Sequence, residues 1–151
     1  MYVVLVGSRN WESKEEDMQV NRILDELYQK YGSGELVIVS SSCDKGVGVA
    51  VKSRCLKDKD KFQLIDFHCR VFAKLPRNKL AQVFMARNKA LLALGEEFHI
   101  CVDSDRRGAF EDLIETLERA KADVGYSNNL GPHYIHHGEA EVGNVDNRNE
   151  D

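Results

Sequence analysis

Short apolar runs alternate along this chain with longer segments whose apolar residues recur at helical spacing. The runs cover residues 2–6, 35–40, 61–67 and 97–102, and the helical segments cover residues 15–31, 45–57, 77–94 and 108–122. A strand that is apolar throughout is typical of a parallel sheet covered on both faces. We therefore predict an α/β fold: a Rossmann-like doubly wound parallel sheet of four to five strands with helices on both faces.

Three details of this architecture are less strongly patterned. Residues 61–67 are more amphipathic than the other runs, so this strand is expected nearer an edge of the sheet. Residues 124–126 are the candidate for the fifth strand. Within the helix at 77–94, the apolar residues expected in the core include Leu80, Phe84 and Met85.

The chain has 151 residues, 42% of them apolar, which is the size and composition of one globular domain. We assign residues 1–127 to this domain and residues 128–151 to a C-terminal extension. Residues 138–151 contain five acidic residues and one arginine, which accounts for the whole net charge of −4. This end is expected to be a solvated, disordered tail on a body of zero net charge.

Composition also narrows the location and the partners. No apolar run approaches the ~18 residues that a membrane span requires, and no signal-peptide cleavage site precedes the first strand. No CxxC pair occurs among the four cysteines, which indicates reduced, mostly buried thiols in a cytoplasmic protein: Cys43, Cys55, Cys69 and Cys101. Because no block of Lys and Arg is present, binding to duplex DNA is not expected.

The loops that follow the strands carry the candidate functional residues. In a doubly wound sheet these loops meet at the carboxyl ends of the strands, where ligands bind. They hold glycines, hydroxyls and cations, and two of them lead into helix N-termini, whose free N–H groups suit phosphate. These features predict a site for a small anionic, nucleotide-type ligand, with no further cofactor. The candidate binding residues in the loops are Gly7, Ser8, Arg9, Trp11, Ser41, Ser42, Lys45, Gly46, Arg106, Arg107 and Gly108.

Two common nucleotide-binding motifs do not fit. Gly46 and Gly48 follow the second strand and lack the third Gly or Ala of the dinucleotide fingerprint, which disfavours a standard NAD-dependent dehydrogenase. Lys52 is not preceded by the glycine that a P-loop requires, which excludes a P-loop NTPase.

Several candidates have a structural interpretation as well. Serines in such loops cap helices, and arginines on turns are often solvated. Trp11, the only tryptophan, is a candidate for stacking on a base or for packing against the following helix. His133, His136 and His137 look like zinc ligands, but no acid or cysteine lies at metal-site spacing beside them, so no metal is expected.

Three segments, in this order and spacing, resemble the SLOG superfamily, the Rossmann-like group that includes LOG phosphoribohydrolases and DprA-related nucleotide-binding domains. They are residues 7–9 (Gly-Ser-Arg), the glycine-bearing turn at 40–50, and residues 85–89 (Met-Ala-Arg-Asn-Lys) together with 105–113. The likeness is greatest to the small bacterial or phage branch that carries Gly-Ser-Arg, and it spans roughly residues 1–122. It implies a pocket for a nucleotide or an ADP-ribose derivative, to which Arg87 and Asn88 contribute. It also implies a homodimer or higher homo-oligomer, with the helix at 77–94 as the candidate interface.

In the LOG enzymes, an arginine and a glutamate serve cleavage of the N-glycosidic bond of a nucleoside monophosphate. Arg87 matches the arginine, and the glutamate position falls on Asp112, with Glu111 beside it. Both acids lie in the first turn of a helix, where the helix dipole stabilises them without any catalytic role. The glycine-rich loop of the enzymes is replaced by residues 104–106 (Ser-Asp-Arg).

These departures favour a protein that binds the nucleotide, as a sensor or a sequestering sponge, without chemistry. The alternative is a LOG-like nucleoside-monophosphate N-glycosidase (phosphoribohydrolase). A single-stranded DNA-binding domain is disfavoured by the neutral body and the acidic tail.

Overall fold

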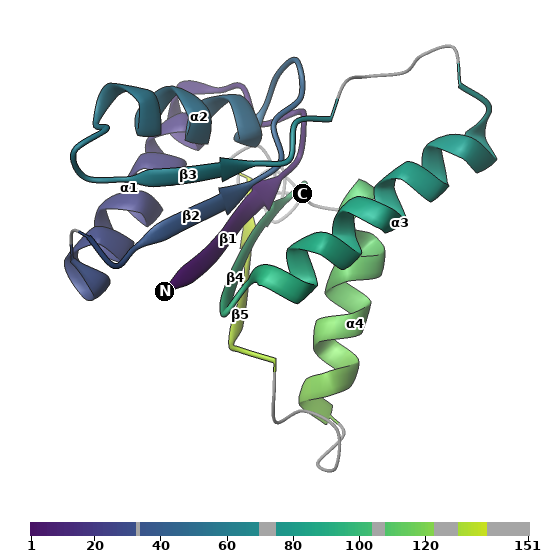
Figure 1. The fold of residues 1–151 in the computed structure, drawn as a ribbon. Helices are drawn as coiled ribbons and strands as arrows, with labels where there is room; N and C mark the ends of the chain where they lie inside the picture. Colours follow the sequence, from purple (N-terminus) through teal and green to yellow (C-terminus); the bar gives the residue numbers. More distant parts are fainter. Residues whose placement is uncertain (33, 70–74, 104–107, 123–129, 139–151) are drawn as a thin grey trace, which may run out of the picture.

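The computed structural model describes residues 1–32, 34–69, 75–103, 108–122 and 130–138. Its five-stranded sheet has the order β3-β2-β1-β4-β5, and every pair of neighbours is parallel. The strands are β1 (Tyr2–Gly7), β2 (Val37–Ser40), β3 (Gln63–Asp66), β4 (Glu97–Val102) and β5 (His133–His137). The helices are α1 (Lys14–Tyr31), α2 (Val47–Lys57), α3 (Arg77–Leu94) and α4 (Glu111–Ala122), and one 3-10 turn, Gly108–Phe110, precedes α4. Helices α1 and α2 cover one face of the sheet and α3 and α4 the other (Figure 1), which confirms the predicted doubly wound α/β fold.

The central strand β1 separates two apolar cores. Successive side chains of a strand point to opposite faces. Val3 and Leu5 pack in the core beneath α1 and α2, while Val4 and Val6 pack in the core beneath α3 and α4. All four side chains are fully buried. A continuous apolar run is therefore what a strand between two helix layers requires.

Helix α1 begins and ends at signals that the sequence carries. The hydroxyl of Ser13 accepts a hydrogen bond from the backbone N–H of Glu16 at 3.1 Å, and the Glu16 carboxylate accepts one from the Ser13 N–H at 3.2 Å. The helix stops at Gly32, which has a φ of 72° and donates its N–H to the carbonyl of Tyr28. The helix predicted at 15–31 is confirmed to within one residue at its start.

The fifth strand differs from the prediction. It is β5, which pairs with β4 from Phe98 to Val102, whereas the predicted strand at 124–126 lies outside the described residues. The sheet therefore includes part of the segment after residue 127 that was expected to form an extension. Of the acidic tail expected at residues 138–151, all but Gly138 also lies outside the described residues. Three of the five residues of β5 are histidines, so no apolar run marks it as a strand. As an edge strand it is only partly covered, and polar residues are tolerated there.

Helix α3 has the predicted bounds but a different buried face. Its N-terminal half extends past the sheet (Figure 1), so this half has no strand to pack against. Met85 is 46% exposed, and Leu80 and Phe84 are only half-buried. The expected core position of these three residues is therefore wrong, because the sequence pattern does not reveal where the sheet ends.

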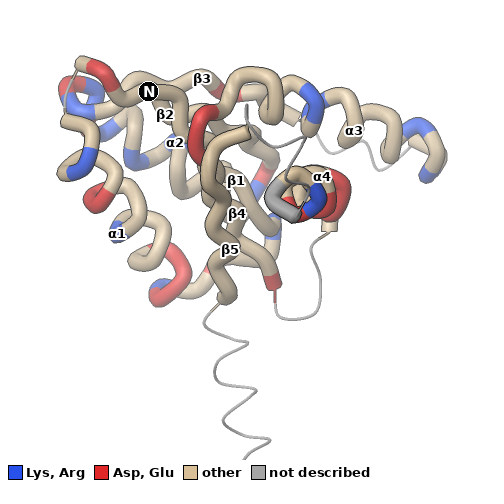
Figure 2. Tube along the Cα trace, turned by 90° about the horizontal axis from the view of Figure 1, so that it is seen from below, with Lys and Arg blue, Asp and Glu red and all other residues tan. Residues whose placement is uncertain are grey.

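The exterior of the molecule carries charges of both signs. Lys and Arg are interspersed with Asp and Glu along α1 and α4 (Figure 2).

Strand β3 lies at one edge of the sheet, as its amphipathic sequence predicts. Across the part of the chain that the structure describes, no helix combines the length and the apolar character needed to cross a membrane.

Candidate functional site

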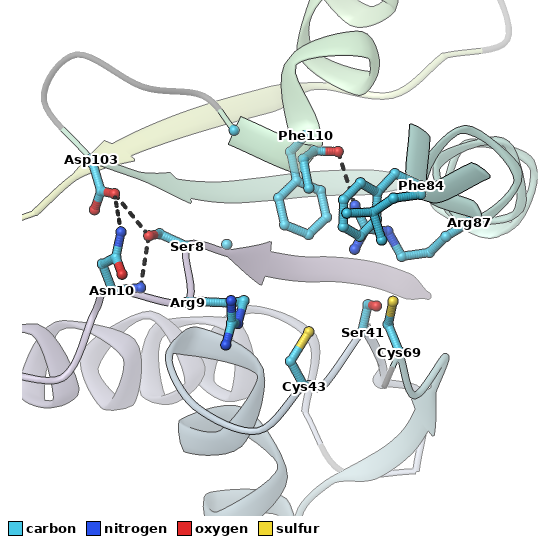
Figure 3. A pocket seen from close by; sticks show the side chains of 14 residues that line it. Ser8, Arg9, Asn10, Ser41, Cys43, Cys69, Phe84, Arg87, Asp103 and Phe110 are labelled. Atoms are coloured by element: carbon cyan, nitrogen blue, oxygen red, sulfur yellow. Dashed lines mark hydrogen bonds between the residues drawn. The ribbon is translucent and has the colours of Figure 1, made fainter. Parts of the chain in front are cut away.

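A cavity of about 250 Å³ lies at the carboxyl ends of β1, β2 and β4. It forms there because the loops after parallel strands leave the sheet at the same edge. The lining comes from the loops after all four of the first strands, from α3 and from the 3-10 turn (Figure 3): Gly7, Ser8, Arg9, Asn10, Ser41, Cys43, Cys69, Leu80, Phe84, Arg87, Asp103, Gly108, Ala109 and Phe110. The predicted binding residues that line this cavity are Gly7, Ser8, Arg9, Ser41, Arg87 and Gly108.

Two glycines allow the loop after β1 to pack closely against its neighbours. A Cβ on Gly7 would lie 2.4 Å from the carbonyl oxygen of Cys101 on β4. Gly46 has a φ of 91°, and a Cβ there would lie 2.3 Å from the carbonyl oxygen of Ser8. The same carbonyl accepts a hydrogen bond from the N–H of Val47 at 3.0 Å, which anchors the start of α2 on this loop. Gly46, a predicted ligand contact, therefore supports the loop from outside the cavity lining.

Arg87 is the buried cation of the cavity. Arg87 is 9% exposed. The Cζ atom of its guanidinium lies 4.0 Å from the ring centroid of Phe110 and 5.0 Å from that of Phe84. Nη2 donates to the carbonyl of Ala109 at 2.9 Å, and Nε and Nη2 donate to Oδ1 of Asn88 at 3.2 and 3.0 Å. Asn88 is fixed in turn, because its amide donates to the same carbonyl at 3.0 Å. These contacts hold the guanidinium in one orientation.

No carboxylate of the described residues forms an ion pair with Arg87. Burial lowers the pKa of its guanidinium, but arginine stays charged at neutral pH. The thiols of Cys43 and Cys69 lie beside each other in one wall of the cavity (Figure 3). Burial raises the pKa of the Cys43 thiol. Three of the four cysteines are buried, as the sequence predicted. The positive charge of Arg87 thus faces the cavity without a matching negative charge among these neighbours.

Arg9 supplies a second cation at the rim. Its Nε and Nη2 donate to Oδ1 of Asp44 at 3.0 and 2.9 Å, and Nη2 also donates to Oδ2 at 3.0 Å. The Arg9 side chain is 43% exposed and that of Asp44 is 58% exposed, so this ion pair is solvated and weak. An anionic ligand in the cavity would compete with Asp44 for Arg9.

Asp103 places a carboxylate at the opposite end of the cavity from Arg87 (Figure 3). Its Oδ2 accepts hydrogen bonds from the Ser8 hydroxyl at 3.0 Å and from the Asn10 amide at 3.1 Å. The backbone N–H of Asn10 donates to the Ser8 hydroxyl at 2.9 Å, which completes a small network between the loops after β1 and β4. Both ends of the cavity are therefore charged, with opposite signs.

The two predicted serines after β2 have different roles. The Ser41 hydroxyl lines the cavity and donates to the carbonyl of Phe67 at 2.8 Å. Ser42 lies outside the lining and is 1% exposed. Its hydroxyl donates to Oδ2 of Asp66 at 2.5 Å and lies 2.9 Å from Nδ1 of His68, so it joins the loops after β2 and β3.

Three other predicted ligand contacts also lie outside the lining: Asn88, which instead orients Arg87, and Trp11 and Lys45. Trp11 is 3% exposed, and its indole N–H donates to the carbonyl of Val102 at 3.2 Å. Its packing in the core with α1 corresponds to the structural alternative rather than to base stacking. The ammonium of Lys45 lies 3.8 Å from the Glu12 carboxylate, in a groove between α1 and α2.

The acids predicted for the enzymatic alternative do not reach the cavity. Glu111 and Asp112 are exposed in the first turn of α4, and neither lines the cavity. The predicted cations Arg106 and Arg107 lie outside the described residues.

Of the three β5 histidines, His136 belongs to a partly buried polar cluster on the face of the sheet opposite α3. Nδ1 of His99 lies 3.0 Å from Nε2 of His136, and Nε2 of His99 lies 2.7 Å from the Glu97 carboxylate. That carboxylate also accepts hydrogen bonds from Lys30 at 3.2 Å and from the Tyr31 hydroxyl. Within the described ranges, no three His, Cys, Asp or Glu side chains are grouped so that they could hold a metal ion. The cluster, like His133 and His137 beside it on β5, lies away from the cavity lining.

Sequence reasoning missed the acidic end and the aromatic wall of the cavity. Asp103 had a signal, because it follows a fully buried strand and so stands at the edge where ligands bind. Asn10 directly follows Gly-Ser-Arg and had the same signal. Leu80, Phe84 and Phe110 had none, because apolar residues of a helix or turn are expected to face the core.

The geometry therefore identifies a cavity with a fixed guanidinium at one end, a carboxylate at the other and apolar side chains between the loops. Comparison with known proteins adds no relative to this description. The chain matches no family model, and no curated protein and no solved structure matches it significantly.

Proposed function

We propose that this protein binds a small anionic, nucleotide-type ligand in the cavity at the carboxyl ends of the strands, and that it acts as a sensor or a sequestering protein. The observation that carries this proposal is that Arg87 is buried and has no carboxylate partner among the described residues. Burying a charged group is costly unless an opposite charge accompanies it. A phosphate in the cavity would provide that charge, and Asn88 and Ala109 hold the guanidinium in place beside it.

The rest of the lining suits the other parts of a nucleotide. Leu80, Phe84 and Phe110 offer apolar and aromatic surface for a base. The hydroxyl of Ser8 and the amide of Asn10 offer polar contacts at the other end. Arg9 at the rim adds a second cation for a negatively charged group.

Binding without chemistry is the better supported form of the proposal. Cleavage of an N-glycosidic bond requires a carboxylate near the sugar to stabilise positive charge in the transition state. Neither Glu111 nor Asp112 lines the cavity, so the pair of residues expected from the enzymes is not assembled there. The carboxylate of Asp103 does line the cavity, so the N-glycosidase is the second candidate function.

The proposal extends the resemblance to the SLOG superfamily, and its setting is the cytoplasm, where thiols stay reduced. The homodimer or higher homo-oligomer that the resemblance implies, with α3 as its interface, stays a prediction. The exposed side chain of Met85 is the feature of α3 that supports it. Light scattering of the purified protein measures the mass in solution and tests this prediction directly.

The experiment is a binding panel followed by analysis of the recovered ligand. Nucleoside monophosphates, ADP-ribose and cyclic ADP-ribose are titrated into the purified protein by calorimetry, and each mixture is then separated by chromatography. The variants are Arg87→Met and Arg87→Lys, and the control is Arg22→Met, an exposed arginine of α1 whose side chain is 66% exposed.

Binding of an intact ligand that is lost in Arg87→Met, weakened in Arg87→Lys and unchanged in Arg22→Met supports the proposal. Lysine keeps the charge but lacks the planar fork, so an intermediate effect is expected. Unchanged affinity in Arg87→Met would overturn the proposal. Recovery of free base and ribose phosphate would establish the N-glycosidase instead.

A further inference from the structure

The two charged ends of the cavity impose an order on any ligand that occupies it. Arg87 and Asp103 lie at opposite ends (Figure 3), each held by neighbouring side chains or backbone. A phosphate is attracted to the guanidinium and repelled by the carboxylate. The group that lies against Asp103 must therefore be a hydrogen-bond donor, because an ionised carboxylate only accepts.

The hydrogen bonds that Asp103 accepts from described residues all go to one of its two carboxylate oxygens. Oδ2 accepts from both Ser8 and Asn10, which fixes the orientation of the carboxylate. Within the described residues, Oδ1 receives none of the hydrogen bonds found for this side chain. A fixed acceptor in the lining of a cavity discriminates strongly against a ligand that lacks the matching donor.

The size of the cavity suits about one nucleotide. Its volume of about 250 Å³ lies just below the ~300–1,000 Å³ that is usual for sites of larger organic ligands. A ligand with two nucleoside units, or with a second ribose as in ADP-ribose, would extend beyond it. Among the ligands of the proposed function, the cavity therefore favours the mononucleotides.

A ribonucleoside monophosphate meets these constraints through its own geometry. The base and the 5′-phosphate are attached on either side of the sugar ring oxygen, and the 2′- and 3′-hydroxyls form the opposite edge of the ring. A ligand with its phosphate on Arg87 and its base against Phe84 and Leu80 leaves the hydroxyl edge for the opposite end of the cavity, where Asp103 lies.

We propose that Asp103 accepts hydrogen bonds from the ribose hydroxyls and thereby makes the cavity selective for ribonucleoside monophosphates over their deoxy counterparts. This inference rests on the proposed function, which it narrows to one class of ligand. Asp103 is then a specificity-determining residue, placed for this role by Ser8 and Asn10.

The test compares sugars in the intact protein. AMP, GMP, CMP and UMP are titrated by calorimetry beside their 2′-deoxy and 3′-deoxy forms, and IMP is included to vary the exocyclic amine of the base. Loss of a hydrogen bond to a charged acceptor should weaken binding of a deoxy ligand ~10- to 100-fold. The same titrations are made with Asp103→Asn, and with Asp60→Asn as a matched control at an exposed position before β3.

The expected result is a preference for the ribonucleotide that falls to within about threefold in Asp103→Asn and persists in Asp60→Asn. Equal binding of ribonucleotides and deoxynucleotides by the native protein would overturn the inference and leave the proposed function standing. A preference that remains in Asp103→Asn, or that follows the exocyclic amine instead of the sugar, would also overturn it. The comparison in the native protein needs no variant, so it stays decisive even if Asp103→Asn folds poorly. If no nucleotide binds at all, the proposed function fails, and the inference fails with it.

Discussion

Replacing Arg87 by methionine distinguishes a binding residue from a structural one, because the two roles predict different changes in stability. Arg87 is 9% exposed and has no carboxylate partner among the described residues. A buried arginine kept for stability should leave a large loss of folding free energy when removed. A buried arginine kept for a ligand should leave a small loss, or none, together with a large loss of affinity.

The contacts of Arg87 give the expected size of the change. Its hydrogen bond to Ala109, made by a charged donor, contributes about 1.5–3 kcal/mol. Its contacts with the rings of Phe84 and Phe110 contribute about 1–2 kcal/mol together. The desolvation of a buried charge, which methionine does not incur, costs several kcal/mol. Methionine also packs well against aromatic rings, so we expect the free energy of unfolding to change by less than about 2 kcal/mol.

The assay is urea denaturation followed by the fluorescence of Trp11, the only tryptophan, which is buried in the core. Leu91→Ala is the matched control, since Leu91 lies one turn further along α3 and is fully buried. Deleting its side chain should lower the free energy of unfolding by about 2–5 kcal/mol and leave the affinity of the folded protein unchanged. The binding measurement is calorimetry with the mononucleotide that binds best.

The two variants should therefore show opposite patterns. Arg87→Met should stay folded but lose the ligand, whereas Leu91→Ala should be less stable but still bind it. If Arg87→Met loses more than about 3 kcal/mol and still binds the ligand, Arg87 is a structural residue and the reasoning is wrong.

Three other residues give measurable expectations. Asp44→Asn frees Arg9 from a weak, exposed ion pair, so calorimetry should show up to about fivefold tighter binding of a mononucleotide; weaker binding would show that Asp44 positions Arg9 instead. Gly46→Ala should lower the free energy of unfolding by more than about 2 kcal/mol in urea denaturation, and by clearly more than Gly34→Ala, which has the same φ of 91° and no atom within 4 Å of its Cβ; equal effects of the two changes would refute the clash. Burial lowers the pKa of His136 from 6.5 to about 4, so the unfolded chain takes up a proton in this range that the folded chain does not, and stability falls as the pH falls from 6.5 toward 4, by at most about 3 kcal/mol. Thermal denaturation across this pH range should show a flatter profile in His136→Gln, and an unchanged profile would contradict the assignment.

The fold was predictable where one helix or strand is defined by its own residues. The bounds of β4 and α3 agree with the prediction because an apolar run and a long periodic segment are set by local sequence. Strand β5 was not predictable, because its residues are mostly polar. It is held by backbone pairing with β4, including a hydrogen bond from the N–H of Phe98 to the carbonyl of Pro132 at 3.0 Å.

The candidate site was predictable in its position but not in its composition. Parallel strands bring their following loops to one edge, so Ser8 and Arg9 were correctly placed at the cavity. Lys45 was an equally good candidate for ligand binding in the sequence, yet its ammonium pairs with the Glu12 carboxylate between α1 and α2. Asp103 shares the cavity with Ser8, which lies 95 positions away in the chain, and no local pattern encodes that contact.

The order of the first four strands and of the four helices along the chain, the two buried faces of β1 and the edge of the sheet that carries the loops are determined by the sequence alone. These features follow from the spacing of apolar residues, and burial of apolar surface acts on every segment in the same way. The direction of each polar side chain, the exposure of the first half of α3 and the burial of Arg87 without an acid among the described residues were decided only by the tertiary structure. They depend on which distant loops meet, and a hydrogen bond forms or fails over a few tenths of an ångström that spacing in a sequence does not specify.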